Sequence, residues 1–233
     1  IVDITRIKNL ETELAKSEKL AALGKMAAIL AHEIKTPLTS IKMNSDILSE
    51  TLPLSSEDKK SFSIIDKEIV RLKNLVKEVL QFSKEMELNK SHFSLNELID
   101  ELIATNSRRL SEKNFIIKNK SENIEVEADR EKVSQVFLNL IDNSLEASPD
   151  GKLEILASVS NGEVKINFID DGAGIPEEVR NKILEPFVTT KASGTGLGLA
   201  VAQKIIERHK GKIRLIDWKP GRTNFEITLP KES

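Results

Sequence analysis

Hydrophobic residues in the first fifty positions recur at alternating steps of three and four residues. The positions that share this spacing are Ile7, Leu10, Leu14, Leu20, Leu23, Ala27, Leu30, Ile34, Leu38, Ile41 and Leu48. Such a repeat places one apolar stripe along an α-helix, as in a coiled coil or a helical bundle. We therefore expect one long helix over residues 7–50. Pro53 should end it, because the residue before a proline avoids the helical region.

A second heptad pattern follows within the next thirty residues. The stretch "SSEDKK" (55–60) is typical of a helix start, with serine at the cap and acids in the first turn. The apolar positions after it are Ile65, Ile69, Leu72, Val76, Val79 and Met86. Two helices joined by a short turn form an antiparallel hairpin. A single hairpin cannot enclose a core, so we expect two copies to form a homodimeric four-helix bundle.

The periodicity changes after about residue 90, where short strands alternate with amphipathic helices. We expect helices over 94–110, 129–148 and 196–210, and strands over 114–120, 124–128, 212–218 and 223–229. Residues 152–170 predict a hairpin that turns at Asn161-Gly162. Strands with helices on one face form an α/β sandwich of the α+β class. The charged stretch from Lys84 to Phe93 is the expected linker.

Composition narrows the class of protein. The chain is 39% hydrophobic and 31% charged, with a net charge of −2. The net charge shows no excess of basic residues, so nucleic acid is not an expected partner. There is no cysteine, which excludes disulfides and thiolate metal sites. A reducing, cytoplasmic location would suit this composition.

No stretch of the sequence predicts a membrane span. The most apolar segment, "LAALGKMAAILAH" (20–32), is interrupted by Lys25 and is too short to cross a bilayer. A signal peptide is not recognisable either. Because the sequence begins at Ile1 without a methionine, we expect it to be a fragment of a longer protein.

His32 lies opposite the apolar stripe of the first helix, so it is not expected in the core. Alone it would be read as a solvated polar residue. Its neighbours favour chemistry: Glu33 could accept a proton from one ring nitrogen and leave the other free as a nucleophile. Thr36 lies one turn further on the same face, where its hydroxyl could hold a water. Pro37 removes a backbone donor to the carbonyl of Glu33 and loosens the helix there.

The heptapeptide "HEIKTPL" (32–38) resembles the phosphoacceptor box of sensor histidine kinases. In that family the histidine is phosphorylated, the following acid assists the transfer, and the residue four positions on serves a phosphatase activity. The resemblance assigns these roles to His32, Glu33 and Thr36. His92 and His209 lack such neighbours and are interpreted as structural or surface residues.

Polar and glycine-rich stretches in the second half could form a nucleotide site. Asn139 and Asn143 project from one helix face, and their amide oxygens would suit a hydrated Mg²⁺. Alone, the pair could equally be solvated surface. Asp170 ends a strand in "DDGAGI" (170–175), either as part of a simple turn or as an acceptor for an exocyclic amine such as that of adenine. "GTGLGL" (194–199) opens a helix, and backbone donors there can cradle phosphate.

The order and spacing of four stretches carry a second resemblance. "NLIDNS", "DDGAGI", "EPFVTTK" and "GTGLGL" resemble the N, G1, F and G2 boxes of the histidine-kinase ATP-binding domain, which has the Bergerat fold shared with gyrase, a mismatch-repair ATPase and a heat-shock chaperone. The implied roles are Mg²⁺ binding, adenine recognition and phosphate contact for ATP. The residues are Asn143 and Asn139 near Mg²⁺; Asp170 on adenine; Gly172 and Gly174 in the adenine turn; Gly194, Gly196 and Gly198 at the phosphates; Phe187 anchoring the lid; and Lys191 at the γ-phosphate.

The resemblance covers residues 20–230, with small departures. Ser144 stands where an alanine is common, and Arg222 replaces the usual glycine of the last hairpin turn. The box set and the short "FVTTK" lid are most similar to the nitrogen-regulation subgroup. Residues 3–11, "DITRIKNLE", resemble the exit of a PAS sensor domain.

These resemblances imply a protein-histidine kinase core in three parts. Residues 1–19 would be a signal-transmitting coiled-coil helix, 20–88 the dimerisation and phosphotransfer domain, and 93–233 the catalytic ATP-binding domain. His32 would take the γ-phosphoryl group of Mg-ATP and pass it to an aspartate of a response regulator, with phosphatase activity toward that regulator. The implied docking residues for the regulator are Thr39, Ser40, Met43, Asn44 and Ile47. For Met43 and Ile47, packing within the bundle is an equal alternative.

Two other functions fit the sequence less well than the kinase does. A mechanical ATPase of the same fold needs a glutamate to activate water, and Asn139 at that position cannot act as a base. A non-catalytic dimeric scaffold predicts a damaged nucleotide site, whereas each of the four boxes is intact.

Overall fold

The computed structural model describes residues 34–83, 86–148, 150–160, 162–191 and 194–231. The chain divides into two compact units between Glu85 and Met86.

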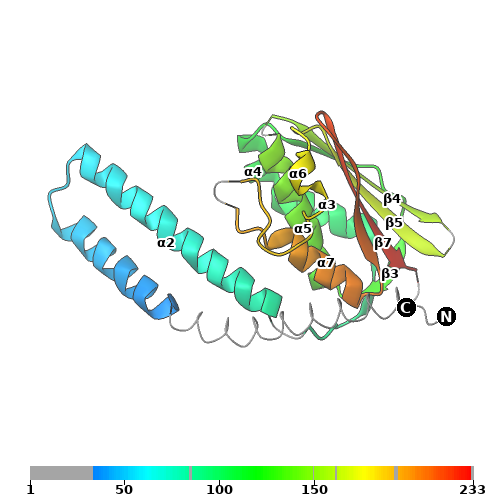
Figure 1. The fold of residues 1–233 in the computed structure, drawn as a ribbon, viewed down its shortest axis with the longest axis horizontal. Coiled ribbons are helices and arrows are strands. Elements are labelled where there is room, and N and C mark those ends of the chain that lie inside the picture. The colour runs from blue at the N-terminus through cyan, green and yellow to red at the C-terminus, as the bar shows by residue number, and fades with distance from the viewer. Residues whose placement is uncertain (1–33, 84–85, 149, 161, 192–193, 232–233) are drawn as a thin grey trace, which may run out of the picture. The chain divides into compact units, whose positions relative to one another are not determined.

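The first unit is a helical hairpin. Residues 34–51 are helical, and α2 runs back from Ser56 to Ser83 beside them (Figure 1). The first helix ends two residues before Pro53, as predicted. Ser55 caps α2: its Oγ accepts the Asp58 N–H at 3.1 Å, while the Asp58 carboxylate accepts the Ser55 N–H at 3.0 Å. This reciprocal pair fixes where α2 begins.

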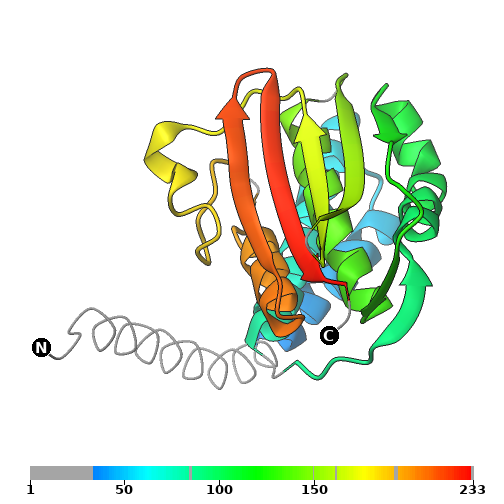
Figure 2. The same cartoon turned by 90° about the vertical axis from the view of Figure 1, so that its right-hand side faces the viewer.

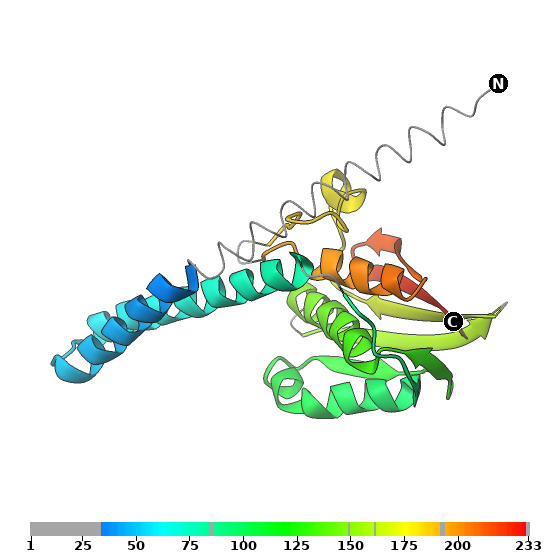
Figure 3. The same ribbon diagram turned by 90° about the horizontal axis from the view of Figure 1, so that it is seen from below.

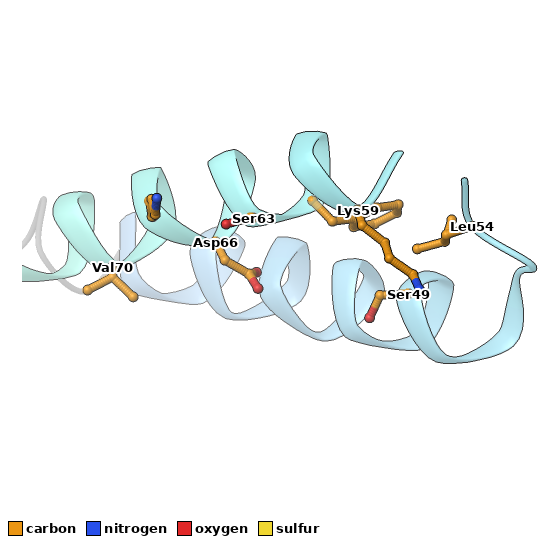
Figure 4. Close-up of a pocket in the computed structure, with 8 residues that line it drawn as sticks. Ser49, Leu54, Lys59, Ser63, Asp66 and Val70 are labelled. Carbon is orange, nitrogen blue, oxygen red and sulfur yellow. The ribbon is translucent and has the colours of Figure 1, made fainter. Parts of the chain in front are cut away.

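The two helices of the hairpin are joined by apolar and ionic contacts. Leu38 and Ile69 are buried. The Lys42 ammonium bridges the helices, with Asp46 at 2.6 Å on its own helix and Asp66 at 3.0 Å on α2. Near the turn the helices enclose a groove, into which Asp66 points and across which Lys59 extends toward Ser49 (Figure 4).

Several heptad positions of the hairpin stay exposed within a single chain. Ile34, Ile41 and Leu48 recur every seven residues on the first helix, and Ile65 and Leu72 do so on α2. Their side chains are between 39% and 51% exposed. A hairpin this thin covers only one side of each helix, so the remaining apolar stripe requires a further partner.

The second unit contains a five-stranded sheet, a two-stranded sheet and five helices among the described residues. In chain order the elements are β1 (Ser91–Ser94), α3 (Leu95–Thr105), α4 (Ser107–Glu112), β2 (Ile116–Asn119), β3 (Glu125–Ala128), α5 (Arg130–Ala147), β4 (Lys152–Ser160), β5 (Glu163–Asp170), α6 (Glu177–Arg180), α7 (Gly198–Arg208), β6 (Lys212–Lys219) and β7 (Arg222–Pro230).

The larger sheet has the strand order β2-β4-β5-β7-β6, with every pair antiparallel except β2 and β4. Figure 2 shows this sheet face-on, and Figure 3 shows α3, α5 and α7 covering one of its faces. Alternate residues of β4, β5 and β7 are buried, as expected for a sheet with one covered face. The Phe137 and Phe168 rings meet edge to face at 5.1 Å between α5 and β5. The predicted α/β sandwich is confirmed.

Three local features differ from the sequence prediction. Residues 91–93, predicted as linker, belong to β1, which pairs with β3 through backbone hydrogen bonds that side-chain periodicity does not report. The helix predicted over 94–110 is divided into α3 and α4 at Asn106, whose side-chain amide donates to the Leu102 carbonyl at 2.8 Å and shares it with the Asn106 backbone N–H at 3.2 Å. The short helix α6 was not predicted. Among the described helices, none has the length and apolarity to cross a membrane.

Candidate nucleotide-binding site

Helix α5 carries three polar side chains of the site on one of its faces. Asp129 caps its start by accepting the Lys132 N–H at 3.0 Å. Asn139, Asn143 and Glu146 follow at steps of four and three residues, so they share one face of the helix. The Asn139 side-chain amide donates to the Gly198 carbonyl at 2.9 Å, which fixes α5 against the first residue of α7.

Asp170 is the buried carboxylate of the site, with only 5% of the residue exposed. It ends β5 and accepts hydrogen bonds from the Gly172 N–H at 2.9 Å and from the Ser144 hydroxyl at 3.2 Å. Burial raises the pKa of Asp170 above its ordinary value, while the bonds from Gly172, Ser144 and Thr223 lower it in part. Among the described residues, the groups that hold this carboxylate in place are neutral donors.

The glycines after Asp170 allow the chain to turn closely against two neighbouring elements. A Cβ on Gly172 would lie 2.7 Å from the Cβ of Ala147 at the end of α5. Gly174 has φ +81°, and a Cβ there would lie 2.7 Å from the Trp218 carbonyl oxygen. The Ile175 N–H donates to that carbonyl at 2.9 Å, so the turn is fastened to β6. This turn leaves no room for larger residues.

The "EPFVTTK" and "GTGLGL" stretches lie against each other through their backbones. The Phe187 N–H donates to the Gly196 carbonyl at 3.0 Å. Gly196 has φ +70°, and a Cβ on it would lie 2.5 Å from the backbone of Phe187. Phe187 itself has φ +67° and a side chain that is about half exposed. A Cβ on Gly194 would meet the Thr189 hydroxyl at 2.5 Å.

Lys191 connects the same stretch to α5. Its ammonium donates to Asn143 Oδ1 at 2.6 Å and forms an ion pair with Glu146 Oε2 at 2.5 Å. Two oxygens on successive turns of one helix therefore converge on a single cation. Together with the bond from Asn139 to Gly198 and the contact of Gly172 with Ala147, this places all four predicted boxes around α5.

These residues fit an adenine nucleotide carrying a divalent cation. The Asn143 and Glu146 oxygens already hold a positive charge in the form of the Lys191 ammonium, and oxygen donors of this kind suit Mg²⁺. Gly174 packs against the backbone of Trp218 and Pro220, so the turn is held close to β6 just after Asp170. Asp170 supplies carboxylate oxygens that can accept from an amine.

Three contributors to this site were not predicted from the sequence. In the sequence Ser144 is only a departure from alanine, yet its hydroxyl lies 3.2 Å from Asp170 Oδ2 and 3.0 Å from the Leu140 carbonyl, which share its single hydrogen. Thr223 reaches Asp170 from β7, a pairing that depends on sheet register. Glu146 could have been found, because it continues the spacing of Asn139 and Asn143 along one face.

His209 has the structural role expected of it. It is buried at the end of α7, where its Nε2 accepts the Asp129 N–H at 2.9 Å and its Nδ1 lies 2.8 Å from the Ile205 carbonyl. Nδ1 must therefore carry the proton, and the ring is neutral. Burial lowers the pKa of His209 below its ordinary value. His92 is exposed on β1.

The phosphoacceptor box is described only in part. His32 and Glu33 lie outside the described residues. Thr36 is exposed on the first helix, as are the predicted docking residues Thr39, Ser40, Met43, Asn44 and Ile47. The Thr39 hydroxyl donates to the Lys35 carbonyl at 2.8 Å, and the Asn44 amide donates to the Ser40 carbonyl at 2.8 Å. Met43 and Ile47 do not pack into their own hairpin, being 63% and 47% exposed.

Two family models match the chain, one mainly on each of its two units. Residues 22–87 match the "His Kinase A (phospho-acceptor) domain", and residues 128–233 match the "Histidine kinase-, DNA gyrase B-, and HSP90-like ATPase". Sporulation kinase A of Bacillus subtilis is 36% identical over 99% of this chain and 38% of its own length. The chain spans between 31% and 56% of the length of the curated relatives it matches.

Solved structures of histidine kinases are similar to this chain in fold as well as in sequence. Histidine kinase ThkA, in complex with the response regulator TrrA, is 35% identical over 98% of this chain and 68% of ThkA, with a TM-score of 0.69. Full-length ShkA in complex with AMPPNP is 25% identical over 89% of this chain and 46% of ShkA, with a TM-score of 0.75. The fold, the boxes gathered on α5 and these similarities show that the chain belongs to the sensor histidine kinase family.

Proposed function

We propose that this chain is the catalytic core of a sensor histidine kinase that phosphorylates His32 with Mg-ATP and passes the phosphoryl group to an aspartate of a response regulator. The single observation that carries the proposal is the convergence of Asn143, Asp170, Gly196 and Lys191 around α5. The matched phospho-acceptor domain supplies the histidine on the same chain. ThkA, a relative of known structure, was solved with a response regulator.

In the first step a His32 ring nitrogen attacks the γ-phosphorus of ATP. A P–N bond forms, the bond to the β,γ-bridging oxygen breaks, and ADP leaves. Glu33 takes the proton that the ring loses as it becomes a phosphoramidate. Phosphoryl transfer depends mainly on positioning and charge neutralisation, so the two units must move relative to each other during the cycle.

The residues of the second unit bind and orient the nucleotide in this proposal. Asp170 accepts from the adenine amine, the glycine turn at Gly172 and Gly174 admits the base, and the backbone of Gly194, Gly196 and Gly198 donates to phosphate. Asn143, with Asn139 beside it, would hold Mg²⁺, which neutralises phosphate charge when bound. Lys191 contacts the γ-phosphate, and Phe187 anchors the segment that carries Lys191.

The second step requires a partner surface on the hairpin. We infer that the regulator docks on the exposed face that carries Thr39, Ser40, Met43, Asn44 and Ile47. We further infer that the exposed stripe of Ile34, Ile41, Leu48, Ile65 and Leu72 is covered by a second copy of the hairpin in a homodimer. Exposed repeats of apolar residues on both helices support this inference.

Three finer assignments belong to the same proposal. Residues 1–19 would transmit a signal from a PAS-like sensor, 20–88 would form the phosphotransfer domain and 93–233 the ATP-binding domain. The box residues and short "FVTTK" stretch favour the nitrogen-regulation subgroup. The cytoplasm, where ATP is available, is the inferred location.

Incubation of the protein with γ-labelled ATP and Mg²⁺ tests the proposal. The expected product is a label on the protein that is labile in acid and stable in base, as a phosphoramidate is. Label that survives acid, or release of inorganic phosphate without labelled protein, would instead indicate another acceptor or a simple ATPase. The latter is disfavoured by Asn139, whose amide cannot act as a base and is bonded to Gly198.

A further inference from the structure

Lys191 and the proposed cation of the nucleotide depend on the same oxygen atom. The Lys191 ammonium lies 2.6 Å from Asn143 Oδ1 and 2.5 Å from Glu146 Oε2. A Mg²⁺ ion bound to Asn143 Oδ1 would lie about 2.0–2.1 Å from it and must be surrounded by oxygens. An ammonium at hydrogen-bond distance from that oxygen would occupy the space of the ion or of its water ligands, and the two positive charges would repel each other.

Glu146 is what holds the ammonium in this position. A neutral amide oxygen alone binds an ammonium less strongly than a carboxylate does. Glu146 lies one turn after Asn143, and its side chain is 53% exposed, so its contact with Lys191 is not imposed by burial. The Lys191 side chain is 33% exposed and reaches both oxygens.

We propose that Glu146 controls cation binding: it holds the Lys191 ammonium on Asn143, so that a metal–nucleotide complex binds only by displacing this ammonium. The displaced Lys191 is then available for the terminal phosphate. The inference rests on the proposed function, because it assumes that Asn143 binds the cation of the nucleotide. It adds to that function a residue that tunes the affinity for the metal-bound form.

The test is the affinity of ADP for the full chain, measured by calorimetry with Mg²⁺ and with EDTA. ADP is the probe because it lacks the terminal phosphate, so displacement of Lys191 is measured without the contact that Lys191 would gain. Glu146→Gln keeps the size of the side chain and removes its charge. A partly exposed ion pair contributes little, so we expect Mg-ADP to bind about two- to fivefold more tightly. With EDTA, where no ion competes for Asn143, the affinity should not change.

Two further variants separate competition from simple charge effects. Asp142→Asn is the matched control: it removes a charge from the same helix, but Asp142 pairs with Arg109 at 2.5 Å and not with Lys191. It should bind Mg-ADP as the wild type does. In a Lys191→Met background, Glu146→Gln should have no further effect, since the competing ammonium is absent.

Several results would overturn the inference. Weaker binding of Mg-ADP by Glu146→Gln would mean that the carboxylate itself supports the cation. Three results would indicate general repulsion between carboxylate and phosphate. These are an equal gain in ADP affinity from Glu146→Gln with EDTA, an equal gain from Asp142→Asn, and an equal gain from Glu146→Gln in the Lys191→Met background. Unchanged affinity in all variants would also refute it. Failure of the wild type to bind ADP at all would refute the proposed function first, and that outcome is seen in the wild-type titration alone.

Discussion

Replacing Asp170 by Asn should weaken nucleotide binding without destabilising the second unit. The substitution can preserve the hydrogen bonds with Gly172 and Ser144. The amide oxygen can still accept from the Gly172 N–H, and the amide NH₂ can donate to the Ser144 oxygen, whose own hydrogen donates to Leu140. What is lost is a charge that burial makes costly, as the raised pKa of Asp170 shows.

The affinity for ATP and the free energy of unfolding should therefore respond differently to the substitution. A buried charged acceptor contributes about 1–3 kcal/mol to a hydrogen bond, so the affinity for ATP should fall by roughly 5- to 150-fold. The free energy of unfolding at neutral pH should be unchanged or higher, because the cost of burying a charge disappears. The gain should vanish below about pH 3.8, the ordinary pKa of the carboxyl, where both side chains are neutral.

The chain offers a direct reporter for stability. Trp218 is its single tryptophan and lies on β6 of the second unit, with the Arg180 guanidinium 4.6 Å from its ring centroid. Denaturant unfolding followed by Trp218 fluorescence therefore reports that unit, and titration with a fluorescent ATP analogue reports binding. A parallel loss of stability and affinity would show that Asp170 is mainly structural, and an unchanged affinity would place adenine elsewhere.

Four other outcomes are expected. His32→Gln should abolish the acid-labile label while dimer formation, measured by light scattering, and ATP binding persist; label at the wild-type level would contradict the role of His32. Thr36→Ala should autophosphorylate normally but leave a labelled regulator to decay at its spontaneous rate; equal decay with both proteins would make Thr36 a surface residue. Residues 86–233 alone, the whole second unit, should be a monomer that binds ATP, and a dimer on light scattering would contradict the division of roles. Because burial lowers the pKa of His209 below its ordinary value of 6.5, the neutral ring contributes fully to the free energy of unfolding above about pH 6.5. That contribution is lost as the pH falls below 6.5, and His209→Gln should reduce this pH dependence in unfolding followed by Trp218 fluorescence.

Local patterns in the sequence predicted the elements that depend on side-chain periodicity. The end of the first helix before Pro53 and the cap at Ser55 follow from backbone chemistry within a few residues. The same reasoning missed β1, because its pairing with β3 involves residues more than thirty positions away. It also missed the division at Asn106, where the side-chain amide shares the Leu102 carbonyl with the backbone N–H.

The site was predicted as four separate stretches, and the sequence could not show how they meet. The contact of Lys191 with Asn143 spans 48 residues, and that of Asn139 with Gly198 spans 59. Neither spacing is periodic, so both depend on the packing of α5 and α7 against the sheet. The spacing of Asn139, Asn143 and Glu146 along α5 was the signal available for adding Glu146.

Arg222 shows how a departure from a family pattern can be resolved by its neighbours. The glycine usually found there is absent, but Gly221 precedes it with φ +80° and takes the left-handed position of the turn. Arg222 can then begin β7 and pair with Asp217 across the hairpin at 3.3 Å. The Gly221 N–H donates to the Gly172 carbonyl at 2.8 Å, so this turn also supports the loop that follows Asp170. With Gly221 in the left-handed position, the turn therefore supports the loop on which the proposed adenine site depends.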